Sequence, residues 1–117
     1  MPLIQVFTSA AAPPPAAREK LLRELSQALA THFEKPERWV MTCLVPELAM
    51  TFAGTAAPTC FAAVKNVGKL SDERAARISA DLTQRLAAGL GLSPERVYLE
   101  LTEAEGRLWG WNGETFG

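Results

Sequence analysis

The 117-residue sequence contains two consecutive halves with the same order of features, and this repetition constrains the fold most. Each half has a short run of β-forming residues, then apolar residues at four-residue spacing, then a second β-forming run. The equivalent apolar positions are Leu21 and Ile78, Leu25 and Leu82, and Leu29 and Leu86. Chance similarity is the alternative for pieces this short, but the shared order favours two strand-helix-strand units.

Capping and turn residues set the boundaries of the two helices. Proline is tolerated in a first helical turn, so the first helix is expected to begin near Pro15 and to stop at Lys35-Pro36. Ser71 is a suitable N-cap for the second helix, which is expected to end at Gly89 or Gly91. Strands are expected at Leu3–Thr8, Arg38–Val45, Thr59–Val67 and Val97–Leu101, with a short extended piece at Met50–Gly54.

These elements predict an α+β fold in one domain, residues 1–117. Right-handed crossovers make the strands within each unit parallel, which gives a four-stranded mixed sheet with both helices on one face. Successive residues of a strand point to opposite faces of the sheet, and apolar residues occur on both: Leu3 and Phe7 on one face, Ile4 and Val6 on the other. Because two helices cover only one face, we expect the other face to pack in a closed homo-oligomer.

Composition argues against several classes of protein. Twelve Lys and Arg against thirteen Asp and Glu give a net charge of -1, so no nucleic-acid or membrane partner is expected. Two cysteines and one histidine make a metal site or a His-based triad hard to assemble. With no signal-like segment or long apolar run, the expected location is cytoplasmic, although non-classical secretion leaves no such mark.

Five short motifs occur in order along the chain. They are Met1-Pro2, Lys35-Pro36, Val67-Gly68-Lys69, the run Ser93–Tyr98 and the ending Gly110–Gly117. With these motifs, essentially the whole chain resembles the macrophage migration inhibitory factor (MIF) family of the tautomerase superfamily. The resemblance implies a homotrimer with its sheets wrapped into a barrel, active sites at subunit interfaces, and no cofactor.

The resemblance also implies that Pro2 is the catalytic residue. Removal of Met1 would make Pro2 a free secondary amine, whereas an amide nitrogen cannot act as a base. Burial or a nearby cation lowers the pKa of an α-amino group, and the neutral amine can then move a proton between carbon and oxygen. Taken alone, Pro2 would be only a permitted residue at the start of a strand.

A substrate pocket follows from the same resemblance. Lys35 would hold a carboxylate or carbonyl and depress the Pro2 pKa, the backbone N–H of Val67 would bind the carboxylate, and Tyr98 would enter from a neighbouring subunit. Without the resemblance, Lys35 is a lysine at the negative end of a helix dipole. Glu100 replaces an asparagine of the best-known animal members, and its charge would oppose carboxylate binding and raise the Pro2 pKa.

The chain ends in a concentration of aromatic residues, Trp109, Trp111 and Phe116. These residues have two alternative roles, contact with the substrate and packing at a subunit interface. Together with a cation they suit an enolisable keto acid of the arylpyruvate class, such as phenylpyruvate. The CxxC motif of the animal members is absent, with Thr59 and Ala62 in its place, so thiol oxidoreductase activity of that kind is not expected.

Three functions follow in order of preference. The first is an isomerase, a cofactor-independent keto-enol tautomerase that uses Pro2. The second is a cytokine-like signalling or interaction module with a vestigial pocket and a protein receptor as its partner. The third is a ferredoxin-like domain that binds a small ligand without chemistry.

Overall fold

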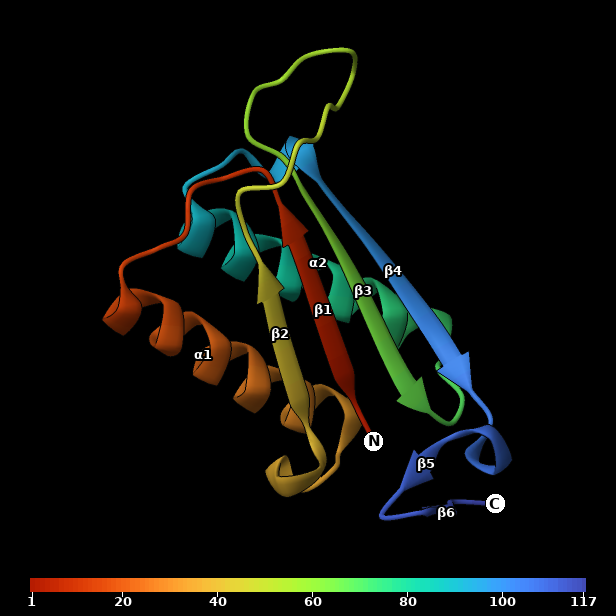
Figure 1. Ribbon diagram of the computed structural model, residues 1–117. Helices are drawn as coiled ribbons and strands as arrows, with labels where there is room; N and C mark the ends of the chain where they lie inside the picture. The colour runs from red at the N-terminus through yellow and green to blue at the C-terminus, as the bar shows by residue number, and fades with distance from the viewer.

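The computed structural model describes residues 1–117 and has the expected two strand-helix-strand units (Figure 1). The first contains β1 (Leu3–Thr8), α1 (Pro15–Phe33) and β2 (Met41–Val45); the second contains β3 (Cys60–Val67), α2 (Asp72–Leu90) and β4 (Val97–Ala104). The strand order is β2-β1-β3-β4, with parallel pairing inside each unit and antiparallel pairing between β1 and β3. The α+β fold class is therefore confirmed, and both helices cover one face of the sheet.

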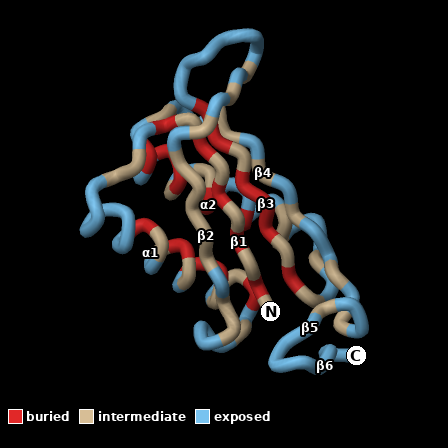
Figure 2. Tube along the Cα trace, in the orientation of Figure 1, coloured by how far each residue is buried: buried red, intermediate tan, exposed pale blue.

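The core lies between the sheet and the helices, where the buried residues of β1, β3, α1 and α2 meet (Figure 2). The helical residues predicted from the repeat are all buried: Leu21, Leu25 and Leu29 of α1, and Ile78, Leu82 and Leu86 of α2. They pack against alternate residues of the central strands, such as Ile4 and Val64. The two halves therefore contribute equivalent apolar stripes to one core.

Both helices end in the same way although their capping residues differ. Gly91 ends α2 in the left-handed region at φ 67°, and the Leu92 N–H donates to the Ala87 carbonyl. At the end of α1, Glu34 adopts φ 54°, and the Lys35 N–H donates to the Ala30 carbonyl at 3.1 Å. This cap stabilises the backbone conformation of Lys35 directly after the helix.

The segment before β2 differs from expectation, whereas β4 begins at Val97 as predicted. Residues Glu37–Trp39 (η1) and Pro94–Arg96 (η2) each form a 3₁₀ turn, so β2 begins at Met41 rather than at Arg38. The predicted extended piece at 50–54 is a loop whose only ladder contact is a bridge between Phe52 and Thr55. Prolines at the head of each turn explain the late strand start, because proline favours a first helical turn and offers no ladder N–H.

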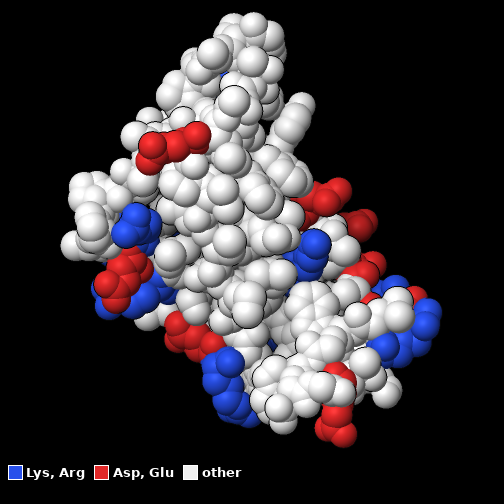
Figure 3. All heavy atoms as spheres, viewed as in Figure 1, with Lys and Arg blue, Asp and Glu red and all other residues white.

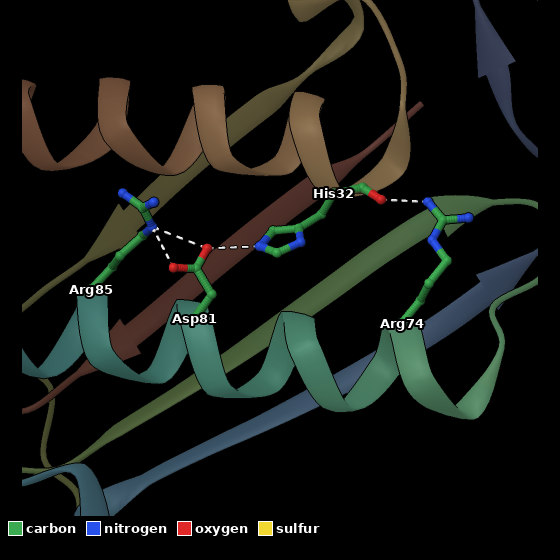
Figure 4. A network of polar contacts seen from close by, with 4 residues as sticks. All are labelled: His32, Arg74, Asp81 and Arg85. Carbon is green, nitrogen blue, oxygen red and sulfur yellow. Dashed lines mark hydrogen bonds and ion pairs between the residues drawn. The ribbon is translucent and has the colours of Figure 1, made fainter.

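A polar network joins the two helices on the side away from the sheet (Figure 4). His32 Nε2 of α1 lies 2.7 Å from Asp81 Oδ2 of α2, and the Arg85 Nε donates to both Asp81 oxygens. Arg74 donates to the His32 carbonyl. Burial alone would raise the pKa of Asp81, but hydrogen bonds from His32 and Arg85 and their charges hold it below its usual value.

The opposite face of the sheet is open to solvent and carries large apolar side chains. Phe7 and Phe61 stack on it with ring centroids 6.2 Å apart, and Met41 and Tyr98 are both 65% exposed. In Figure 3 the acidic and basic residues lie mostly toward the margins of this face. None of the helices has the length and apolar character needed to cross a membrane.

Candidate active site

A pocket of about 140 Å³ lies at the end of the sheet where β1 begins. Figure 1 shows that the N-terminus lies beside the C-terminal hairpin at this end. Residues from the chain start, from η1 and β2, and from the C-terminal segment line the pocket: Met1, Pro2, Leu3, Trp39, Met41, Trp109, Gly110, Trp111 and Phe116. Segments far apart in sequence therefore enclose Pro2, whose side chain is fully buried.

Aromatic rings form one wall of the pocket. Trp39 meets Trp111 edge to face at 4.8 Å between ring centroids and meets Phe116 at 5.9 Å. Trp111 and Phe116 stack at 6.5 Å. Trp39 was not predicted as a site residue, because a tryptophan in a presumed strand is a normal core residue, and only the η1 turn directs it toward the C-terminal segment.

The C-terminal segment folds on itself through the turn η3 (Gly106–Leu108) and the short hairpin of β5 (Gly110–Trp111) and β6 (Glu114–Thr115). The Phe116 N–H donates to the Gly106 carbonyl at 3.0 Å and to the Trp109 carbonyl at 3.2 Å. A Cβ at Gly106 would lie 2.9 Å from the Phe116 carbonyl oxygen, so only glycine allows this close approach. The hairpin thereby holds Trp109, Trp111 and Phe116 at the pocket.

The terminal amino group lies in an environment that disfavours its charge. Burial, with a smaller contribution from the charge of Lys35, lowers the pKa of the Met1 amino group below its usual value. The same nitrogen donates to Oδ1 of Asn66 at 3.5 Å, and Asn66 is 5% exposed. A neutral amine at this end of β1 is thus favoured by both burial and a nearby cation.

Lys35 does not line the pocket, but its charge acts on the terminal amine. Val67 ends β3 beside Asn66, whose Nδ2 donates to the Val67 carbonyl at 3.1 Å. Trp109, Trp111 and Phe116 line the pocket. Six of the predicted positions, namely Pro2 and these five, therefore lie at or act on the same end of the molecule.

Tyr98 and Glu100 lie elsewhere within the chain. Tyr98 is opposite Phe61, at the end of the sheet away from Pro2, and contacts Phe52 at 4.9 Å. Along β4, Tyr98 is five positions from Glu103, the residue level with Pro2, a distance of roughly 17 Å. Glu100 is exposed on the open face of the sheet. Neither side chain lines the Pro2 pocket of its own chain.

Other reactive side chains are dispersed. No group of three His, Cys, Asp or Glu residues lies close enough together to hold a metal ion. Both cysteines are free, and burial raises the pKa of Cys60 to about 11, which keeps this thiol protonated and unreactive. The titratable group beside the Pro2 pocket is the terminal amine, on which the charge of Lys35 acts.

Comparisons with known proteins identify the family of the chain. The family model for macrophage migration inhibitory factor (MIF) matches residues 1–117. The chain belongs to the MIF family. It is 34% identical over 116 residues to the MIF of Rattus norvegicus, with 99% of each chain covered, and 33% identical over 95 residues to a MIF homologue of Trichuris trichiura, with 81% and 83% covered.

Solved structures of MIF-family proteins share the whole fold. A MIF homologue from Prochlorococcus marinus has a TM-score of 0.91 at 40% identity and covers 98% of this chain and 99% of its own. MIF from Toxoplasma gondii has a TM-score of 0.90 at 27% identity, with 97% and 99% covered. Membership of the MIF family places the chain in the tautomerase superfamily and supports isomerase-type activity in general.

Proposed function

We propose that this MIF-family protein is a cofactor-independent keto-enol tautomerase of arylpyruvates such as phenylpyruvate, with the amine of Pro2 as general base and acid after removal of Met1. One observation carries the proposal: Pro2 is buried in an aromatic pocket, and the Met1 amino group next to it has a pKa lowered by burial and by the charge of Lys35. A neutral amine in an apolar pocket is what proton abstraction next to a carbonyl requires.

The proposed reaction needs only proton transfers. The neutral Pro2 amine takes a proton from the carbon next to the keto carbonyl, the C–H electrons form the carbon–carbon double bond, and the carbonyl oxygen receives the negative charge. The resulting ammonium then returns a proton to that oxygen and gives the enol. Lys35 would stabilise the substrate carboxylate and the developing oxyanion, and the aromatic wall would bind the substrate ring.

The remaining predicted residues require a neighbouring subunit. We propose a homotrimer whose open sheet faces pack together, which would cover Phe7, Phe61 and Met41. In that assembly Tyr98 and Glu100 would approach the Pro2 pocket of the next subunit, and the Val67 N–H would complete carboxylate binding. Exposure of Tyr98 and Glu100 within one chain is consistent with this role.

Three proteins test the mechanism: the processed wild type, Pro2→Ala, and a form extended by a few residues before Pro2. Phenylpyruvate tautomerisation is measured for each, and intact mass establishes whether Met1 is absent. We expect the rate to fall by about 10²–10⁴-fold in the last two, which is the usual contribution of a general base. Equal rates in all three would exclude catalysis by Pro2.

A protein-interaction role is the second candidate, because the curated relatives carry the name of a migration inhibitory factor. The exposed side chains of Leu108 and Trp111 offer apolar area for a receptor. Receptor binding that survives Pro2→Ala, with no tautomerase activity in the wild type, would favour this role over the enzyme.

A further inference from the structure

The buried asparagine Asn66 lies across the sheet from Pro2, and neither the proposed mechanism nor the sequence motifs use its side chain. In the antiparallel β1–β3 pair, Leu3 is opposite Lys65 and Ile4 is opposite Val64. Continuing this register by one residue places Pro2 opposite Asn66. Both residues are buried and follow the alternation of Ile4 and Val64, so their side chains share one face of the sheet at close cross-strand distance.

The amide of Asn66 is oriented by its other contact. Its Nδ2 donates to the Val67 carbonyl at 3.1 Å, which leaves Oδ1 as the acceptor for the chain terminus. In the structure, Oδ1 accepts a hydrogen bond from the Met1 amino group at 3.5 Å. When Met1 is removed, this buried oxygen loses its donor, and an unsatisfied buried acceptor is costly. The amine of Pro2 is the donor that the register brings opposite it.

We propose that Asn66 is a positioning residue for the Pro2 amine, with Oδ1 accepting a hydrogen bond from the Pro2 nitrogen in the processed chain. A neutral secondary amine has one N–H and one lone pair. When the N–H is held by Asn66, the lone pair is fixed on another side of the tetrahedral nitrogen, where it can receive a substrate proton. After protonation, Asn66 holds one N–H and the other is free to leave.

The groups around this contact act in opposite directions. Lys35, after α1, disfavours the terminal ammonium, whereas a hydrogen bond that Asn66 Oδ1 accepts from the ammonium favours it. On β4, Glu103 is opposite Asn66, but its carboxylate accepts the Leu70 N–H at 2.6 Å and lies 3.9 Å from Lys69. In the C-terminal segment, Arg107 pairs with Glu105 at 2.6 Å. Asn66 is thus the uncharged acceptor placed to balance Lys35.

The catalytic meaning of this contact rests on the proposed function, but its existence does not. The test therefore measures the titration of the Pro2 amine directly, by NMR of protein labelled at proline, in the processed wild type, Asn66→Val and Asn66→Asp. We expect Asn66→Val to lower the titration midpoint by about one pH unit because an acceptor of the ammonium is lost. Asn66→Asp is expected to raise it, because a carboxylate stabilises the ammonium more strongly.

A structural role alone would not move the midpoint in opposite directions. Thr59→Val, which removes a buried hydroxyl directly before β3, serves as the matched control, and no shift is expected for it. Shifts in the same direction for both Asn66 variants, or no shift, would overturn the proposal. If either variant fails to fold, the Asn66 side-chain amide signals of the wild type are followed instead. They are expected to titrate with the Pro2 midpoint, and their failure to do so would equally overturn it.

Activity gives an independent readout. With phenylpyruvate as substrate, Asn66→Val is expected to lower kcat about tenfold with little change in KM, because the lone pair loses its orientation. A KM increase with unchanged kcat would contradict positioning. If the wild type has no tautomerase activity, the proposed function fails, yet the NMR titration still decides whether Asn66 binds the Pro2 amine.

Discussion

The two ends of the sheet are related by the internal repeat, yet only one of them forms a pocket. At one end, β1 and β2 begin beside Pro2 and Trp39. At the other, β3 and β4 begin beside Thr59 and Arg96, which occupy comparable places in the second half. The comparison shows how one architecture, used twice, provides an end with a pocket, the candidate reactive end, and an end without one, called the closed end.

At the closed end, the polar groups form hydrogen bonds with one another. Thr59 Oγ1 donates to the Arg96 carbonyl at 2.7 Å, and the Thr59 N–H donates to Ser9 Oγ at 3.0 Å. The Arg96 guanidinium donates to four carbonyls of the loop between β2 and β3, those of Phe52, Thr55, Ala57 and Pro58. Donors and acceptors at this end are therefore used internally, whereas the Pro2 end leaves an amine beside a cavity.

Lys35→Ala should produce the largest change at the reactive end. We expect KM for phenylpyruvate to rise about 30-fold, which corresponds to about 2 kcal/mol of lost charge-assisted binding. The amine pKa should also rise, because Lys35 lowers it, so the acidic limb of the pH–rate profile should move to higher pH. Steady-state kinetics across pH tests both, with Lys20→Ala, an exposed lysine of α1, as the control. An unchanged KM and profile would remove Lys35 from the site.

Arg96→Met should have the largest effect on the closed end. Removing four hydrogen bonds from a partly exposed arginine is expected to lower the free energy of unfolding by about 1–2 kcal/mol, or Tm by roughly 5 °C. Thermal unfolding measures this, with the exposed Arg77→Met of α2 as the matched control. A Tm equal to that of the control would show that the guanidinium contacts contribute no stability.

Trp111→Ala should have a smaller effect on the pocket. Trp111 is 55% exposed, so its loss removes one face of the aromatic wall while Trp39 and Phe116 stay in contact. We expect KM to increase about fivefold with kcat nearly constant, as for an interaction made equally in the ground and transition states. Leu108→Ala, an exposed residue of the same segment outside the pocket, is the control. A similar KM change in the control would assign the effect to the segment's folding.

Much of the fold could be predicted because the same strand-helix-strand pattern occurs in both halves of the sequence. The helical stripe of Leu21, Leu25 and Leu29 has its counterpart in α2, and capping by Ser71 was confirmed by its hydrogen bond to the Arg74 N–H. The loop that includes Phe52 was not predicted correctly. Its conformation is set by Arg96, more than forty residues later in the sequence, and local β propensity carries no sign of that contact.

The candidate site was predictable where a motif marks it and not where the fold creates it. Pro2, Lys35 and the terminal aromatic residues belong to local motifs. Trp39 and Asn66 reach the same end through a 3₁₀ turn and through cross-strand register, which depend on the pairing of distant segments. Asn66 had one available signal, a polar residue on the buried alternation of an apolar strand, which requires a partner.

The most direct test of the account combines two measurements on one processed sample. The Pro2 amine is titrated by NMR, and kcat/KM for phenylpyruvate tautomerisation is measured over the same pH range. The account predicts that the acid-side midpoint of kcat/KM coincides with the amine midpoint and that both lie below the usual value for an α-amino group, about 8. An amine that titrates at its usual value, or a rate that does not follow its titration, would contradict the assignment of Pro2 as the base.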